Sequence, residues 1–309
     1  MTSPVPVPFT AFKTQLNAYY LGVPGAMQTL RIPDLGVSGP LSRGEVTHDL
    51  ISGGTAVTRR VRARRTYTLG FSGCTPDTAQ TLVGFYVGDY GDGPFCFVDP
   101  AWRNQLRDDT STFGARAQAI SGWALSNPGA ETVNFTSAVT PFEAPSGVAL
   151  WAGAGNGSRL GTGTFTGGVF VPDTAATPPY LSDRTTPVRV YVRTASSTAS
   201  ISLRGLAVAA NGTVASTTTT TATATTAWQA YTAVIPISVT AAYVVIDVLC
   251  NTASAPNLYL SCADVQYGVT TPAGWAGGVG VPRVVVSAGL PSSGPFYVTR
   301  DHALQLAEI

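Results

Sequence analysis

Short segments in which apolar and polar residues alternate, divided by turn residues, restrict the fold of this sequence more than any other feature. Between Ala56 and Phe71 the apolar residues fall mainly on odd positions, and threonine and arginine fill most of the even ones. Successive side chains of a β-strand point to opposite faces of a sheet, so this period of two predicts a long strand or one arm of a hairpin. We therefore expect an all-β fold class, with helix only as a minor component.

One short helix is expected after this strand. Thr75 suits the cap position of a helix, Pro76 its first turn, and Asp77 the positive end of its dipole. Apolar residues follow at helical spacing from Ala79 to Tyr86, which predicts an amphipathic helix packed on a sheet. The sheet is expected to resume with Phe95–Val98.

The chain from Thr112 to Gly268 consists of many short apolar segments between Gly, Pro and Asn turns. Regular short strands of this kind predict a β-sandwich or jelly roll. Ser216–Thr226 is almost entirely Thr, Ala and Ser, and inside such a series it favours a polar strand or a long loop over a disordered linker. The expected strands are Val148–Trp151, Gly168–Val171, Val188–Arg193, Ser200–Val208, Trp228–Ile237, Tyr243–Leu249 and Leu258–Tyr267.

The chain has 309 residues, enough for two domains that each bury a core. We expect residues 1–111 to form a β-structured domain with the short helix. Residues 112–268 are expected to form the sandwich. Residues 269–309 are too few to fold alone, so we expect them to return to one of the two sheets.

Charged residues make up only 11% of the sequence, against roughly 25% in ordinary soluble domains. We therefore expect neighbouring subunits to cover much of the surface. The formal net charge of +1 argues against a specific nucleic-acid binder held by a basic face. No run approaches the roughly 20 apolar residues of a membrane span. The start of the chain lacks the basic and apolar pattern of a signal peptide, so we expect folding in a cytoplasm.

Charge is divided unevenly within the first expected domain. Residues 1–66 hold eight basic and three acidic residues, whereas residues 67–111 hold two basic and six acidic ones. Such a subunit can join copies of itself head to tail, and contacts of this kind can close into a ring. Pairing of the same charges within one subunit is the alternative. The candidate interface residues are Arg60, Arg62 and Arg64, on one face of the expected strand, together with Asp89 and Asp92.

Residues suited to catalysis are few. With two histidines, His48 and His302, and no Cys-x-x-Cys pair, the chain has too few ligands for a zinc site. His48 stands beside Asp49 but lacks the Gly-x-Ser-x-Gly turn of a serine hydrolase. Glu131 and Glu143 could be proposed as a glycosidase pair, but nothing in the sequence sets their separation, and two solvated acids are the favoured interpretation. We expect no catalytic residue, no metal and no cofactor. Reduced, buried thiols are expected at Cys74, Cys96, Cys250 and Cys262.

Sugar recognition needs exposed aromatic faces beside polar groups, because the C–H faces of a sugar pack on rings while its hydroxyls need hydrogen-bond partners. Three aromatic residues of the expected sandwich are candidates for glycan contact. Packing in the sandwich core is the alternative for each. The candidates are Trp123, Trp151 and Tyr180.

The first domain resembles a family of phage proteins. Thr66–Leu69 before the short helix, and Gly93–Pro100 leading to Trp102–Asn104, resemble minor tail proteins of phages that infect actinobacteria. These in turn resemble distal tail proteins. The resemblance implies that the first domain assembles as a ring, commonly a hexamer, below the tail tube.

The middle of the chain is similar to jelly rolls of the carbohydrate-binding type. The matching stretches are Pro179–Ser182, Val188–Arg193, Thr226–Tyr231, Leu258–Leu260 and Asp264–Gly268. This resemblance implies that Trp228 fills the core.

Together these features favour a structural subunit of a phage tail tip and not an enzyme. In this interpretation the first domain is a distal-tail-like ring subunit that joins the tail tube to other tail-tip proteins in the virion. The jelly roll projects outward and binds host-surface polysaccharide weakly, if at all. A carbohydrate-binding adhesin that recognises the host is the alternative, and a cell-wall hydrolase is the third.

Overall fold

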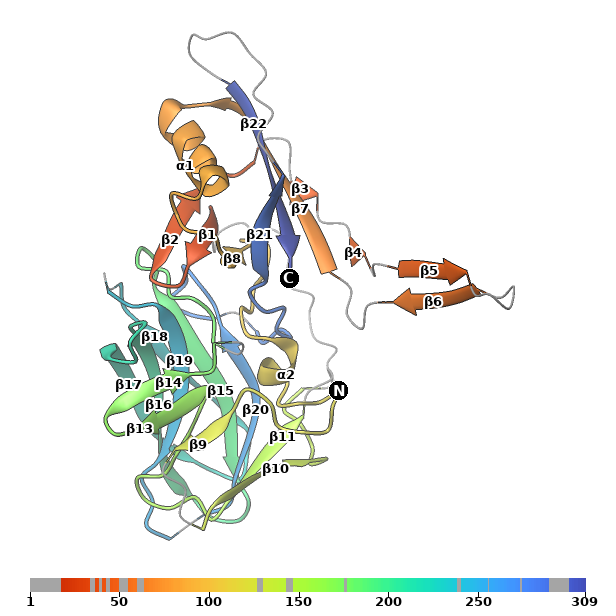
Figure 1. Ribbon diagram of the computed structural model, residues 1–309. Helices are drawn as coiled ribbons and strands as arrows, with labels where there is room; N and C mark the ends of the chain where they lie inside the picture. Colours follow the sequence, from red (N-terminus) through yellow and green to blue (C-terminus); the bar gives the residue numbers. More distant parts are fainter. Residues whose placement is uncertain are drawn as a thin grey trace. The chain divides into compact units, whose positions relative to one another are not determined.

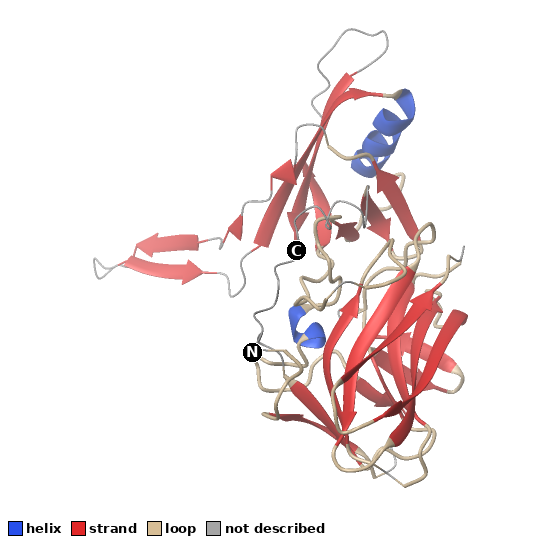
Figure 2. Ribbon diagram, turned by 180° about the vertical axis from the view of Figure 1, so that it is seen from behind, coloured by secondary structure: helices blue, strands red, loops and turns tan. Residues whose placement is uncertain are grey.

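The chain is mostly antiparallel β-sheet, with two helices among the described residues (Figure 2). The computed structural model describes residues 18–33, 37–38, 41–42, 45–49, 55–59, 64–126, 130–142, 147–174, 177–237, 240–254, 256–272, 274–288 and 300–309. These residues form two compact units. The predicted all-β fold class is therefore confirmed.

The first unit, called the sheet unit, comprises Ala18–Val23, Met27–Asp99 and Pro282–Ile309. Its main sheet has eight strands, in the order β2-β1-β8-β21-β22-β7-β3, and β4 also pairs with β7. The strands are β1 (Tyr19–Val23), β2 (Ala26–Leu30), β3 (Val37–Ser38), β4 (Leu41–Ser42), β7 (Arg64–Cys74), β8 (Phe95–Val98), β21 (Arg283–Ala288) and β22 (Arg300–Glu308). The C-terminal segment thus supplies two central strands of this sheet, next to β7 and β8.

The helix α1 (Pro76–Val87) contacts this sheet over β7, β21 and β22 (Figure 1). Thr75 caps it, since the Thr75 hydroxyl accepts a hydrogen bond from the Thr78 amide at 3.4 Å. Gly88 ends it at φ 91°, a left-handed conformation that glycine adopts without strain. Leu82 and Phe85 are buried against the sheet. The predicted helix and its cap are confirmed.

The alternating stretch from Ala56 to Phe71 carries two strands. Its later part is in β7, where Tyr67, Leu69 and Phe71 are buried as the period of two predicts. Its earlier part is in β6 (Thr55–Arg59), which pairs with β5 (Glu45–Asp49) as a separate two-stranded sheet. Residues 60–63 lie outside the described residues.

The second unit, called the sandwich unit, contains the described residues Pro24–Ala26 and Pro100–Val281. It has two five-stranded sheets (Figure 1). The β15 sheet runs β10 (Thr132–Thr136), β11 (Val148–Ala152), β20 (Leu258–Val265), β15 (Thr186–Thr194) and β18 (Gln229–Ile235). The β16 sheet runs β17 (Val214–Ala224), β16 (Ala199–Val208), β19 (Tyr243–Cys250), β12 (Arg159–Gly161) and β9 (Ala124–Ser126). A two-stranded hairpin, β13 (Gly163–Thr166) and β14 (Val169–Pro172), and the one-turn helix α2 (Asp108–Ser111) complete the unit.

The two sheets pack face to face around an apolar core. Gly205 of β16 marks how close they come, because a Cβ atom there would lie 2.8 Å from Ile235 and 3.0 Å from Val188 of the opposite sheet. Ile201, Leu203 and the other inward residues of β16 are fully buried. The threonine-rich stretch that was expected as a polar strand or a loop is the edge strand β17. Its side chains alternate between exposed and half-buried, which explains its polar composition.

The boundary between the units differs from the predicted one at residue 111. Residues 100–111 belong with the sandwich, where Asn104 donates hydrogen bonds to the Ala263 carbonyl and the Ser111 hydroxyl. The Gln105 amide donates to the Val265 carbonyl at 3.0 Å. These buried hydrogen bonds follow no local sequence pattern, so the periodicity of the sequence could not locate the boundary.

Candidate functional site

The three aromatic residues proposed for glycan contact differ in their surroundings. Trp151 is 0% exposed and Tyr180 is 1% exposed, so neither ring has a face open to a ligand. The Tyr180 hydroxyl donates to the Pro236 carbonyl at 2.5 Å, which satisfies its polar end inside the protein. The proposal of glycan contact is corrected for these two residues, because they pack in the core.

Trp123 is also largely buried, at 9% exposure, but it lies at a surface hollow. Its indole stacks on Phe113 with the ring centroids 4.6 Å apart. Its Nε1 donates to the Thr110 carbonyl at 2.9 Å. Phe113 adopts φ 50°, which is uncommon for a residue with a bulky side chain. The indole is therefore held in a fixed orientation before any ligand arrives.

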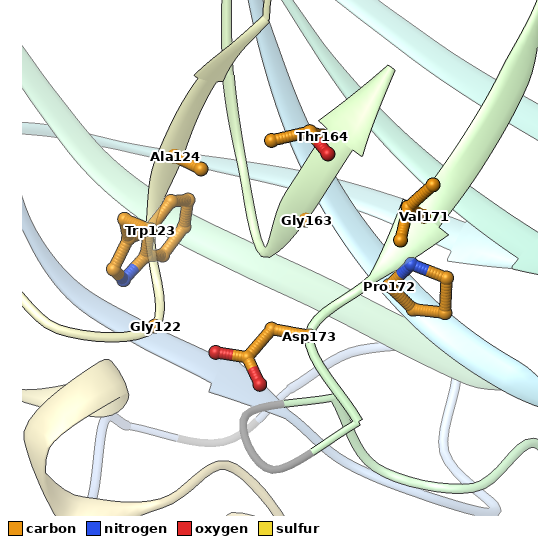
Figure 3. A pocket seen from close by; sticks show the side chains of 8 residues that line it. All are labelled: Gly122, Trp123, Ala124, Gly163, Thr164, Val171, Pro172 and Asp173. Carbon is orange, nitrogen blue, oxygen red and sulfur yellow. The ribbon is translucent and has the colours of Figure 1, made fainter. Parts of the chain in front are cut away.

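The hollow beside Trp123 has a volume of about 250 Å³. Figure 3 shows Trp123, Thr164 and Asp173 arranged around one space, with Val171 and Pro172 on its far wall. The hollow thus combines an aromatic ring, a hydroxyl and the carboxylate of the exposed Asp173. It lies where the chain before β9 meets β13 and the end of β14. We call it the Trp123 hollow.

A charged pair lies in the cross-strand row that ends at this hollow. The row runs from Arg204 to Asp247, Gly161 and Ala124, and Ala124 lines the hollow. Arg204 forms an ion pair with Asp247, with the side chains 16% and 1% exposed. Gly161 has no side chain and lies directly beside Asp247 in this row. A Cβ atom at position 161 would lie 3.4 Å from Asp247 Oδ1.

A second arginine makes this face of the β16 sheet more positive. Arg159 of β12 lies near Arg204, and burial together with Arg159 lowers the pKa of Arg204 to about 10. The Arg159 guanidinium lies 4.4 Å from the centre of the Phe165 ring. Polar groups continue across the sheet, since Asn251 donates to the Ser202 hydroxyl at 2.8 Å. This face therefore offers donors and acceptors for a hydroxyl-rich ligand.

The β13–β14 hairpin packs on this same face. Phe170 of the hairpin is 1% exposed and packs against Leu206, Val208 and Val245 of the sheet. The Phe165 amide donates to the Ser126 hydroxyl at 2.7 Å and ties the hairpin to β9. The hairpin thus covers the apolar residues of this face, and its residues Gly163, Thr164, Val171 and Pro172 also line the Trp123 hollow.

The charged residues proposed for subunit contacts lie in the sheet unit. Arg64 at the start of β7 is exposed, as are Asp89 and Asp92 in the turn after α1. Within the described part of the chain none of these three forms a salt bridge. Arg60 and Arg62 lie outside the described residues. The contact that these residues were proposed to make therefore stays a prediction.

The groups considered for catalysis do not form a site in the described chain. His302 is buried on β22, while the side chain of His48 and the whole of Glu143 lie outside the described residues. Glu131 is half-buried near Gly155. Across the residues that the structure describes, no group of three or more His, Cys, Asp or Glu residues could hold a metal ion.

All four cysteines are buried thiols that form no disulfide, as predicted. Burial raises the pKa of the Cys96 thiol to about 11, although Arg283 partly opposes this shift. The Cys96 thiol is therefore protonated near neutral pH, and burial also raises the pKa of Cys250. Within the described ranges, no helix has the length and apolar character needed to cross a membrane.

Three polar residues of the site were missed by the sequence reasoning. Asp173 carries no local pattern that sets it apart from other acids in turns. Arg204 and Asp247 did carry a signal, since each is the one charged residue of its strand. Burial of a single charge is unfavourable, so two such strands with opposite charges indicate a cross-strand pair.

The sequence matches no protein-family model and no curated protein. Among solved structures, the CBM22-1 xylan-binding domain from Paenibacillus barcinonensis Xyn10C is 9% identical, with a TM-score of 0.38. That match covers 51% of this chain and 92% of the domain. The family 11 carbohydrate-binding module from Clostridium thermocellum, in complex with a mixed-linked tetrasaccharide, is 9% identical, with a TM-score of 0.34 over 54% of this chain and 95% of the module.

A phage protein is also similar. The enzymatically active domain of bacteriophage CBA120 tailspike protein 4 is 16% identical, with a TM-score of 0.39. The match covers 55% of this chain but only 22% of the tailspike chain. With TM-scores below 0.5, these likenesses do not establish a function for this protein.

Proposed function

We propose that the sandwich unit is a non-catalytic carbohydrate-binding module that holds a sugar unit in the Trp123 hollow. The observation that carries this proposal is the fixed indole of Trp123 beside the exposed carboxylate of Asp173 in one hollow (Figure 3). Sugar C–H faces pack on aromatic rings, and sugar hydroxyls donate to carboxylates. The volume of about 250 Å³ is smaller than a typical drug-sized pocket, so it suits a single sugar ring or the end of a chain.

The cross-strand row from Ala124 to Arg204 would set the direction in which such a sugar chain extends from the hollow. From the hollow the row passes Gly161 and reaches the Arg204–Asp247 pair, with Arg159 beside it. Arg204 and Arg159 are donors, and the exposed Thr219 and Thr221 of β17 can both donate and accept. A sugar chain seated in the hollow would meet these groups along the β16 sheet.

The test begins with the full chain on a glycan array, followed by calorimetric titration of the glycans that bind. Asp173→Asn keeps the side-chain size and removes the charge, so affinity should fall about tenfold or more, in line with roughly 1.5–3 kcal/mol for hydrogen bonds to a charged group. Asp183→Asn, at another exposed acid of the same unit, is the matched control and should bind as the unchanged protein does. Binding that is insensitive to Asp173→Asn would contradict the proposed site.

A second candidate function is assembly in a phage tail tip. The β5–β6 hairpin favours it, because among the described strands β5 pairs only with β6. An isolated two-stranded hairpin is at best marginally stable in water, so a neighbouring subunit that packs on it would explain why it forms. In this proposal the sheet unit forms a ring, a hexamer being favoured, that joins the tail tube to other tail-tip proteins of the virion.

Light scattering of the full chain after size-exclusion chromatography tests this second candidate. A ring predicts a molar mass several times that of one chain of 31.9 kDa. Reversing the charge at Arg64 should weaken the assembly if an acidic neighbour contacts it, and changing Arg116 in the sandwich unit should not. A stable monomer at every concentration, together with the absence of the chain from purified particles, would contradict it.

A further inference from the structure

A row of aromatic and polar side chains crosses the outer face of the β15 sheet, on the side of the sandwich away from the β16 sheet. Asn134, Leu150, Tyr259 and Arg193 are cross-strand partners in succession. Trp228 immediately precedes β18, the strand that pairs with β15. The Arg193 guanidinium lies 4.3 Å from the centre of the Tyr259 ring and 5.3 Å from that of Trp228. These residues are called the Arg193 row.

The position of Trp228 corrects a sequence-based expectation. The resemblance to jelly rolls implied that Trp228 fills the core, but its side chain is half-buried and its Nε1 donates to the Val139 carbonyl at 3.0 Å. The aromatic residue at the end of β18 that does point inward is Tyr231, which is 5% exposed. Side chains alternate between the two faces along a strand. Trp228 is three residues from the inward-pointing Tyr231, so it lies on the outer face, as does its neighbour Arg193 on β15.

The rest of this face is covered by the chain itself. Phe142 meets Tyr191 edge to face at 5.0 Å and stacks on Trp275 at 5.9 Å. The Trp275 indole donates to the Ala263 carbonyl at 3.2 Å, which fixes this cover over β20. The Arg193 row is therefore a narrow strip beside a covered area. Such a strip fits an extended chain better than the roughly 800 Å² per partner of a standard protein interface.

Arg193 differs from Arg189 and Arg204, the two arginines of these sheets that form ion pairs. Arg189 pairs with Asp264 and Arg204 pairs with Asp247, whereas Arg193 has no salt bridge with any described residue. Its charge is held between two aromatic rings and is half-exposed. A guanidinium that is fixed but not neutralised favours an anionic ligand group.

A second hollow begins one residue beyond the Arg193–Tyr259 pair. It has a volume of about 260 Å³ and is lined by Thr194, Ser196, Ser197, Ser254 and Asn257. Hydroxyl and amide groups dominate this lining, and they can both donate to and accept from sugar hydroxyls. The hydroxyl-lined hollow is thus next in sequence to the aromatic rings and the positive charge, at the end of β15.

We propose that the Arg193 row is a second ligand site, which binds a sugar chain bearing anionic groups. Sugar rings stack on Trp228 and Tyr259, the anionic group binds Arg193, and hydroxyls reach the serine-lined hollow. Either a carboxylate or a phosphodiester supplies the required charge. This site lies on the opposite sheet from the Trp123 hollow and does not depend on it.

The test uses the full chain and polygalacturonate, a sugar chain with carboxylates, followed by affinity electrophoresis and titration. Methyl-esterified polygalacturonate is the uncharged counterpart, and a ribitol-phosphate teichoic acid is the phosphodiester counterpart. Arg193→Gln should weaken binding of the anionic chain about tenfold, as expected for loss of roughly 1.4 kcal/mol. Arg116→Gln removes an exposed charge elsewhere in the unit and should change binding less than about twofold on the same scale.

Two further variants distinguish ligand binding at this row from a folding defect and from binding at the Trp123 hollow. Arg193→Lys keeps the charge and should retain part of the binding, which guards against a folding defect in Arg193→Gln. Asp173→Asn should leave polygalacturonate binding unchanged, so the two proposed sites can fail separately. Binding of neither anionic chain, equal binding of the methyl-esterified chain, or unchanged binding by Arg193→Gln would overturn the proposal. So would a fall in molar mass of Arg193→Gln in light scattering, because it would identify the row as a protein interface.

Discussion

Replacing Asp264 by Asn should destabilise the sandwich unit strongly. Asp264 is fully buried on β20, and it pairs with Arg189 of β15, whose side chain is 6% exposed. Gln266 also donates to the Asp264 carboxylate, at 3.2 Å. Burial raises the pKa of Asp264, whereas the Arg189 guanidinium lowers it, so the carboxylate depends on this partner for its charge. With an amide at position 264, the guanidinium is left buried without a counter-charge.

Loss of one partner of a buried pair costs about 3–5 kcal/mol. At roughly 2–4 °C per kcal/mol for a unit of this size, the melting temperature should fall by about 6–20 °C. Urea unfolding followed by tryptophan fluorescence is a suitable assay, because all five tryptophans are in the sandwich unit. Fluorescence therefore reports on this unit and not on the sheet unit.

Two control variants accompany Asp264→Asn. Asp183→Asn breaks an exposed pair with Arg184, which should change stability by less than about 1 kcal/mol. The double variant Arg189→Met with Asp264→Leu should recover most of the loss, because apolar residues can replace a buried pair. If Asp264→Asn unfolds at the same urea concentration as Asp183→Asn, the buried pair does not have the role assigned to it.

Three other predictions follow from the packing. The four buried thiols should resist alkylation in the native protein and should all react after denaturation. Mass spectrometry counts the alkylated thiols, and one thiol modified under native conditions would contradict the burial. Thr75→Ala should lower the free energy of unfolding of the sheet unit by about 1 kcal/mol, because the helix α1 loses its cap. Unfolding followed by far-ultraviolet circular dichroism measures this change, and an unchanged free energy would argue against the cap. Gly205→Ala should destabilise the sandwich unit by about 1–3 kcal/mol, because the new methyl group meets Ile235 and Val188 of the opposite sheet. Gly277→Ala, where the nearest atom is 3.9 Å away, is its control, and equal effects of the two changes in urea unfolding would contradict the face-to-face packing.

Local patterns of the sequence predicted the local structure well. The cap of α1 at Thr75, the alternation in β7 and the polar edge strand β17 all depend on neighbouring residues only. The prediction that residues 269–309 return to a sheet did not say which one, and β21 and β22 lie in the sheet unit. Strand pairing over such a distance in sequence depends on the whole fold.

The candidate site was harder to predict because its parts are far apart in sequence. Trp123, Thr164 and Asp173 come from three separate segments, and none carries a motif. Trp151 and Tyr180 have the same aromatic character as Trp123 but lie inside the sandwich. Only the packing of β9 against β13 and β14 distinguishes them. The pair Arg204–Asp247 could have been inferred, since each residue is the one charged residue of its strand, whereas β15 holds both Arg189 and Arg193 and leaves the partner of Asp264 open.

A crystal structure of the full chain grown with an array-selected oligosaccharide would test the carbohydrate-binding proposal most directly. We expect electron density for a sugar ring against the Trp123 indole, with a sugar hydroxyl within hydrogen-bond distance of the Asp173 carboxylate. An array on which no glycan binds, or density for the sugar that avoids both the Trp123 hollow and the Arg193 row, would contradict it.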